Sequence, residues 1–177
     1  IESGIPIYHV GGWFDAQVRS TAVFYATAKD SNPSKLLMTP LYHIMSSPFP
    51  EYFGDNPKKI MPGVKTEMHR FFDRYLKGIE NGIDEEPPVT IYVMGEGFRQ
   101  EEDWPLERAV DTEFFFAPDG VLSRRAPAAG ADIFTADLSH NSSFGPNEGN
   151  RWKMYVIPPE VPDRTELDKK CMTYTTP

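Results

Sequence analysis

Two short apolar stretches, each followed by one side chain of the acid–base type, constrain the fold of this chain more than any other feature. Residues 5–10 form an apolar run with β-branched side chains, and a Gly-Gly pair separates this run from Asp15. Residues 35–38 form a second apolar run, and the loop that follows it contains His43. Catalytic side chains of α/β proteins lie at the carboxyl ends of parallel strands. The pattern therefore predicts two buried strands that present Asp15 and His43 at one edge of a sheet.

The segment between the two runs has the pattern of a helix. Apolar residues recur at helical spacing over residues 16–29, and Asp15 stands where a helix N-cap is expected. Residues 30–33, with the sequence Asp-Ser-Asn-Pro, end this pattern. A strand–helix–strand order favours a parallel pair of strands. The Gly-Gly pair before the helix allows either a positive φ or a close approach of two backbones.

The strongest amphipathic pattern in the chain predicts a second helix over Val64–Lys77. This helix follows an irregular stretch, residues 41–62, that is rich in proline, serine and aromatic residues. We expect Phe71, Phe72 and Tyr75 to dock the helix on the sheet, while its charged residues face the solvent.

The pattern changes again after Pro87 and Pro88. Six short strand candidates follow, at residues 89–94, 112–116, 121–122, 131–135, 152–157 and 172–175. Several short strands without a long helix are typical of a β-sandwich or jelly roll. We therefore predict that residues 1–105 belong to an α/β domain and that residues 106–177 begin an all-β domain.

Composition limits the possible functions. The 177 residues are 40% hydrophobic and 25% charged, as in globular proteins. A net charge of −8 disfavours a nucleic-acid partner, because phosphate binding requires a basic face. No apolar run approaches the roughly 20 residues that span a membrane. The single cysteine, Cys171, excludes an intrachain disulfide, and the histidines lack the spacing of metal-binding motifs, so we expect no metal site.

Asp15 and His43 occur in the order acid then histidine, as in the triads of α/β hydrolases, where the nucleophilic serine comes earlier. In such a triad the carboxylate accepts the Nδ1–H of the imidazole and orients the ring. Alternatively, Asp15 is only a helix cap and His43 an ordinary loop histidine, and the spacing leaves both interpretations open. No Gly-x-Ser-x-Gly motif occurs in the chain. A nucleophilic serine would therefore lie upstream of Ile1, and we expect the chain to be an internal part of a longer protein whose compartment the sequence does not determine.

Several motifs, taken in order, resemble those of the CocE/NonD hydrolases, a group that includes cocaine esterase, α-amino acid ester hydrolases and Xaa-Pro dipeptidyl peptidases. The similar segments are Gly12-Trp13-Phe14-Asp15, the residues 37–43 that precede and include His43, Phe71–Gly78, Val93–Gly95, Asp103–Pro105 and Tyr174–Pro177. The resemblance implies the last part of an α/β hydrolase domain followed by the start of a β jelly roll.

The resemblance also implies roles for individual residues. Asp15 matches the triad acid and His43 the triad base. Their neighbours Trp13 and Tyr42 are candidates for the wall of a substrate pocket.

Two positions in the segment before His43 depart from the family pattern. Thr39 and Leu41 stand where the family usually has glycine and tryptophan, on either side of Pro40. We expect these changes to reshape the wall beside the base.

The function that the resemblance implies is that of a serine hydrolase, an esterase or acylase that cleaves an ester or amide acyl group without a cofactor. Its substrates would be small esters, amides or short peptides, and it would require neither nucleic acid nor a membrane. One alternative is an Xaa-Pro dipeptidyl peptidase, and another is a non-catalytic β binding module attached to a degenerate hydrolase domain. Without its serine the chain alone should be inactive. The sequence does not determine whether the protein forms a homo-oligomer.

Overall fold

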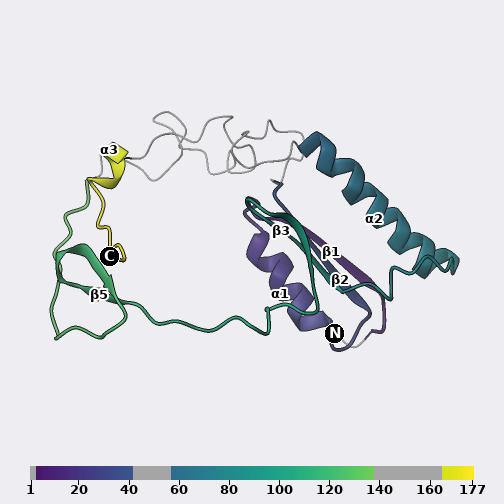
Figure 1. Ribbon diagram of the computed structural model, residues 1–177, viewed down its shortest axis with the longest axis horizontal. Coiled ribbons are helices and arrows are strands. Elements are labelled where there is room, and N and C mark those ends of the chain that lie inside the picture. Colours follow the sequence, from purple (N-terminus) through teal and green to yellow (C-terminus); the bar gives the residue numbers. More distant parts are fainter. Residues whose placement is uncertain (1–2, 42–56, 138–164) are drawn as a thin grey trace. The chain divides into compact units, whose positions relative to one another are not determined.

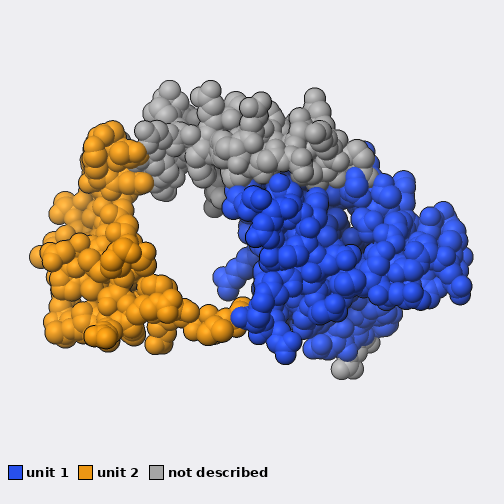
Figure 2. Space-filling model, in the orientation of Figure 1, with its two compact units in different colours: residues 1–108, 152–160 blue, residues 109–151, 161–177 orange. Residues whose placement is uncertain are grey.

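A computed structural model describes residues 3–41, 57–137 and 165–177. The chain divides into two compact units, whose described parts are residues 3–41 with 57–108 and residues 109–137 with 165–177 (Figure 2). Within these residues, no helix combines the length and the apolar character needed to cross a membrane.

The first unit contains a four-stranded mixed sheet with the strand order β1-β2-β3-β4 (Figure 1). The strands are β1 (Ile7–Gly12), β2 (Ser34–Thr39), β3 (Val89–Val93) and β4 (Gly97–Glu101). The first three strands are parallel to one another, and β4 returns antiparallel to β3. Helix α1 (Val18–Ala28) connects β1 to β2. The predicted parallel strand–helix–strand arrangement is therefore confirmed.

One face of the sheet is covered by α1. Tyr25 of this helix is 1% exposed and packs in one core cluster with residues of the two central strands, namely Leu36, Met38, Val89 and Ile91. From Lys35 onward β2 is buried at every position, because both faces of a parallel strand are covered. The short apolar run read from the sequence is thus a central strand of the core.

The other face of the sheet is covered by helix α2 (Pro57–Lys77) (Figure 1). Val64 and Phe71 of this helix are buried, and the Phe71 ring lies 5.2 Å from the ring of Tyr8 on β1. The helix begins at Pro57, before the predicted start at residue 64.

The prediction that Phe72 docks α2 on the sheet is wrong. The Tyr75 ring lies 4.7 Å from that of Phe71, but the Phe72 side chain is 46% exposed. Adjacent residues on a helix point about 100° apart, so Phe71 and Phe72 cannot both face the sheet. Phe72 lies instead on an outward row of apolar side chains with Met68 and Leu76.

The segment that follows α2 is tied back to the sheet by a buried lysine. Lys35 of β2 is 7% exposed, and its ammonium group donates hydrogen bonds to the carbonyls of Ile83 (2.8 Å) and Pro87 (3.3 Å). The same group lies 3.8 Å from a carboxylate oxygen of Glu86. These contacts satisfy a cation that would otherwise be costly to bury.

The second unit contains a small β-hairpin. Strands β5 (Phe115–Ala117) and β6 (Val121–Ser123) are antiparallel, and Pro118–Gly120 form the turn between them. Asp119 in this turn has a φ of 62°. Thr175 adds a single parallel bridge to Val121. The predicted strand at 121–122 is confirmed, and the one predicted at 112–116 begins at Phe115 instead.

The remaining strand predictions of this unit have mixed outcomes. Residues 131–135 form no strand, and the Ile133 side chain is 94% exposed. Of residues 172–175, only Thr175 pairs, and the predicted strand at 152–157 lies outside the described residues. The one helix described after the hairpin, α3 (Thr165–Asp168), is a single turn. A jelly roll over residues 106–177 therefore stays a prediction.

Candidate active site

The candidate site begins where β1 and β2 end. Residues 12–15, which we call the acid loop, run from the last residue of β1 toward α1. The register pairs the last residues of the two strands, Gly12 with Thr39. Beyond this pair, Trp13 N–H donates to the Thr39 carbonyl (2.8 Å) and Phe14 N–H to the Leu41 carbonyl (3.4 Å). The acid loop therefore lies directly beside the segment that leads toward residue 43.

Asp15 is held in a tight turn at the end of this loop. Its Oδ1 atom accepts a hydrogen bond from the Gln17 N–H (2.9 Å), and its own N–H donates to the Gly12 carbonyl (3.0 Å). The N-cap of α1 is Gln17, so the prediction that Asp15 caps this helix is wrong, and Asp15 lies two residues before the cap. The carboxylate bonds to the N–H two residues on, as in an Asx-turn. This bond fixes the orientation of a half-buried carboxylate.

The predicted partner of Asp15 lies outside the described residues. His43 and its neighbour Tyr42 both fall in that part of the chain, so their predicted roles as base and pocket wall stay predictions. The described part of β2 and its extension ends at Leu41, two positions before His43.

Gly12 is required by the close approach of the two loops. A Cβ atom added to Gly12 would lie 2.0 Å from the carbonyl oxygen of Leu41 and 2.7 Å from its carbonyl carbon. Of the two explanations that the Gly-Gly pair allowed, the structure selects close backbone approach, because neither glycine has a positive φ. The glycine therefore brings the two loops into direct contact.

Trp13 anchors the acid loop to the next strands of the sheet. Its indole Nε1–H donates to the Tyr92 carbonyl of β3 (2.7 Å), and its ring lies 6.0 Å from that of Trp104. The half-buried ring packs against both core clusters of the sheet. These contacts fix the loop that carries Asp15, while a role of Trp13 in a pocket wall stays a prediction.

The two positions that depart from the family pattern are both interior. Thr39 is 1% exposed, and its hydroxyl donates to the Gly11 carbonyl (2.9 Å) and accepts from the Leu41 N–H (3.3 Å). Leu41 is 3% exposed and packs with Leu37, Val64 and Tyr92. The expectation that they reshape the wall beside the base stays a prediction, because His43 lies outside the described residues. The sequence contained one indication of the hydrogen bonds that Thr39 makes, namely a residue with a hydroxyl group at the end of a predicted strand.

The described histidines do not form a metal site. His9 is half-buried against the edge of the Tyr25 ring (5.8 Å), and burial lowers its pKa, which favours the neutral imidazole. This agrees with its interpretation as a core histidine. His69 is exposed on α2. No group of three or more histidine, cysteine, aspartate or glutamate residues within the described ranges is placed to hold a metal ion.

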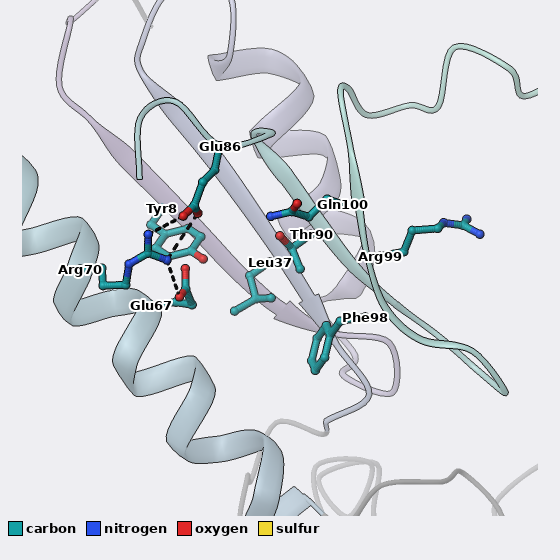
Figure 3. Close-up of a pocket in the computed structure, with 9 residues that line it drawn as sticks. All are labelled: Tyr8, Leu37, Glu67, Arg70, Glu86, Thr90, Phe98, Arg99 and Gln100. Atoms are coloured by element: carbon teal, nitrogen blue, oxygen red, sulfur yellow. Dashed lines mark hydrogen bonds and ion pairs between the residues drawn. The ribbon is translucent and has the colours of Figure 1, made fainter. Parts of the chain in front are cut away.

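A cavity of about 490 Å³ lies between α2 and strands β3 and β4 (Figure 3). Three of its charged groups pair with one another: Arg70 donates to Glu67 (2.9 Å) and makes a short hydrogen bond to Glu86. This bond from Arg70 holds the pKa of the Glu86 carboxyl below its usual range. None of the residues that line the cavity belongs to the acid loop. The sequence motifs did not predict this feature, because its lining comes from α2, from all four strands of the sheet and from the segment before β3.

Comparison with known families defines the class of protein. Residues 81–177 match the family described as the X-Pro dipeptidyl-peptidase C-terminal non-catalytic domain, and because this match covers more than half of the chain, the chain belongs to that family. The match begins in the first unit, before β3, and continues through the second. Asp15 and His43 precede it, so the candidate triad residues lie outside the part described as non-catalytic.

Individual relatives extend the similarity to the candidate site. Predicted serine esterases from Mycobacterium bovis and Mycobacterium tuberculosis are each 29% identical to this chain over 188 residues, which cover 98% of the chain and 28% of those proteins. Cocaine esterase from a Rhodococcus species is 28% identical over 121 residues, or 67% of this chain and 21% of that enzyme. The chain thus spans less than a third of the length of these relatives.

A solved structure supports the same relationship. An aminopeptidase from a marine sediment archaeon of the Thaumarchaeota is 26% identical, with a TM-score of 0.54 over 71% of this chain and 22% of that one. Together with the family match and the esterase relatives, this confirms the resemblance to CocE/NonD hydrolases.

Proposed function

We propose that this chain is the part of a serine hydrolase that supplies the acid and the base of a Ser-His-Asp triad. The observation that carries the proposal is the pairing of the acid loop with the end of β2. The backbone of residues 12–14 bonds to that of residues 39–41, so the loops that carry Asp15 and His43 start side by side. Two relatives that match 98% of this chain are predicted serine esterases.

In this proposal the two residues act together. A serine outside the chain attacks the acyl carbonyl of an ester, and His43 accepts the serine proton. Asp15 accepts the hydrogen bond of the imidazole Nδ1–H and stabilises the imidazolium. His43 then donates this proton to the departing alcohol as its bond to the acyl carbon breaks, which leaves the acyl-enzyme. Water attacks the acyl-enzyme with His43 as base again, and the carboxylic acid leaves as the serine recovers its proton. No cofactor takes part. The Gln17 N–H orients the Asp15 carboxylate for this role.

The proposal includes the domain organisation. Residues 1–105 form the end of an α/β hydrolase domain, and residues 106–177 begin a β jelly roll. The parallel β1-β2-β3 arrangement and the β-hairpin of the second unit support this assignment.

Mutation of the two proposed triad residues in the full-length protein tests the function. Purified variants are assayed for hydrolysis of p-nitrophenyl butyrate. We expect His43→Ala to lower kcat by about 10³-fold or more, because without a base the serine hydroxyl stays protonated. Asp15→Asn should approach the loss of about 10⁴ seen for this substitution in serine proteases, since an amide favours the wrong histidine tautomer.

His69→Ala is the matched control, because His69 is an exposed histidine on α2 and has no proposed role. It should keep wild-type activity, and circular dichroism should show all three variants folded. Wild-type turnover in His43→Ala and Asp15→Asn would show that both are ordinary loop residues.

An Xaa-Pro dipeptidyl peptidase is the second candidate, favoured by the family match over residues 81–177 and by the aminopeptidase neighbour. Such an enzyme needs an acidic anchor for the free amine of its substrate. Turnover of Gly-Pro-p-nitroanilide above that of the butyrate ester, lost when the amine is acetylated, would favour the peptidase. No turnover of either substrate and no labelling by a fluorophosphonate would favour the non-catalytic binding module.

A further inference from the structure

The hydroxyl of Thr39 both donates and accepts a hydrogen bond. Thr39 is the last residue of β2, faces Gly12 in the register and is 1% exposed. The hydroxyl donates to the carbonyl of Gly11 on β1 (2.9 Å) and accepts from the N–H of Leu41 (3.3 Å). One side chain thus bonds both to the strand that leads into the acid loop and to the segment that leads to residue 43.

The backbone alone joins these two segments weakly at this point. Pro40, which follows Thr39 and is fully buried, has no N–H to donate. Beyond the strand ends, the Trp13 N–H bond to Thr39 is short (2.8 Å), but the Phe14 N–H bond to Leu41 is long (3.4 Å). The Thr39 hydroxyl supplies the acceptor for the buried Leu41 N–H, which therefore needs no bond from the opposite strand.

We propose that Thr39 is a positioning residue, whose hydroxyl sets the distance between the acid loop and the segment leading to His43. The inference rests on the proposed function, because that function requires the two loops to meet in one geometry. It is not carried over from the resembling family, which usually has glycine at this position. Reaction rates depend steeply on such geometry, since a displacement of about 1 Å can cost about 10²-fold.

Two comparisons in the full-length protein isolate the effect of the Thr39 hydroxyl: Thr39→Val with wild type, and Thr39→Ser with Thr39→Ala. Thr39→Val keeps the shape of the side chain and removes its hydrogen bonds, while Thr39→Ser and Thr39→Ala differ from each other only in the hydroxyl. Thr90→Val is the matched control, since Thr90 is half-buried on the neighbouring strand β3. If Thr39→Val does not fold, the serine and alanine pair decides the question.

Ester hydrolysis is the first measurement. We expect kcat/KM to fall about 10- to 100-fold in Thr39→Val and Thr39→Ala, and to stay within about threefold of wild type in Thr39→Ser and Thr90→Val. The acidic limb of the kcat/KM profile should move to lower pH by about 0.5 unit or more in the two variants without the hydroxyl, because a looser carboxylate stabilises the imidazolium less. A merely structural role would lower the amount of active enzyme without moving this limb.

Hydrogen exchange gives a measurement that does not depend on activity. The Leu41 amide should exchange at least about fivefold faster in Thr39→Val and Thr39→Ala than in Thr39→Ser, because it loses its acceptor. Equal exchange and equal activity in the serine and alanine variants would overturn the proposal. Faster exchange with an unchanged pH profile and rate would also overturn it, because the hydroxyl would then hold the loops without affecting catalysis.

The same experiments separate this inference from the proposed function. If His43→Ala keeps full activity, the proposed triad is wrong whatever the Thr39 variants do. If His43→Ala is inactive while Thr39→Val matches Thr90→Val in rate, pH profile and exchange, the triad stands and the positioning role of Thr39 is refuted.

Discussion

Replacing Gly12 by alanine tests how closely the two loops approach. A Cβ atom at this position lies 2.0 Å from the Leu41 carbonyl oxygen, whereas ordinary contacts of a Cβ begin at 3.4 Å. The overlapping atoms belong to the backbone, so no side-chain rotation relieves the overlap. The acid loop and Leu41 must therefore move apart by more than about 1 Å.

The cost of this movement follows from the contacts that it breaks. Two backbone hydrogen bonds join the loops, from Trp13 to Thr39 and from Phe14 to Leu41. Each bond contributes about 1 kcal/mol, and overpacking of a buried site costs about 1–3 kcal/mol. We expect Gly12→Ala to lower the free energy of unfolding by about 3–5 kcal/mol.

Gly11→Ala provides the matched control for this experiment. Its added Cβ would meet Thr21 Cγ2 at 2.9 Å and Met38 Sδ at 3.1 Å, which can rotate away, and Thr21 Cβ at 3.1 Å, which needs to shift by only a few tenths of an ångström. We expect this variant to cost about 1 kcal/mol. Urea unfolding of the full-length protein, followed by tryptophan fluorescence, measures both values. Equal stability of the two variants would refute the close approach of Gly12 to Leu41.

Three further predictions concern other parts of the first unit. Trp13→Phe removes the hydrogen bond to the Tyr92 carbonyl and should lower the free energy of unfolding by about 1 kcal/mol, so an unchanged urea midpoint would contradict the anchoring role. Hydrogen bonds from two arginines lower the pKa of Glu101 to about 2 from its usual 4.5, so its stabilising effect is complete above pH 4.5 and is lost as the pH falls toward 2. The difference in Tm between wild type and Glu101→Gln should therefore shrink over this pH range, and a constant difference would contradict it. Gly63→Ala adds a Cβ in open space on α2 and should raise the free energy of unfolding by about 0.5–1 kcal/mol, measured by urea unfolding, and a loss of stability would contradict it.

Sequence periodicity by itself determined most of the strands and helices of the first unit, although it did not predict β4 and placed the start of α2 too late. The strands β1, β2 and β3 and the helix α1 begin within two residues of their predicted starts. These predictions succeeded because alternation and helical spacing are local properties, and the core buries the same apolar residues that form the pattern. The order of the elements also predicted that Asp15 and His43 follow neighbouring parallel strands.

Only the tertiary structure decided the features that depend on a partner distant in sequence. Phe71 and Phe72 are the same residue type at adjacent positions, but the sheet buries Phe71 and leaves Phe72 exposed. Residues 131–135 have the composition of a strand, yet a strand forms only where another strand supplies hydrogen bonds. The close approach of Gly12 to the Leu41 carbonyl and the bond from the Thr39 hydroxyl to the Gly11 carbonyl join segments that are 28 or more residues apart. Their geometry depends on how β1 and β2 end in space, and a local sequence pattern carries no information about that distance.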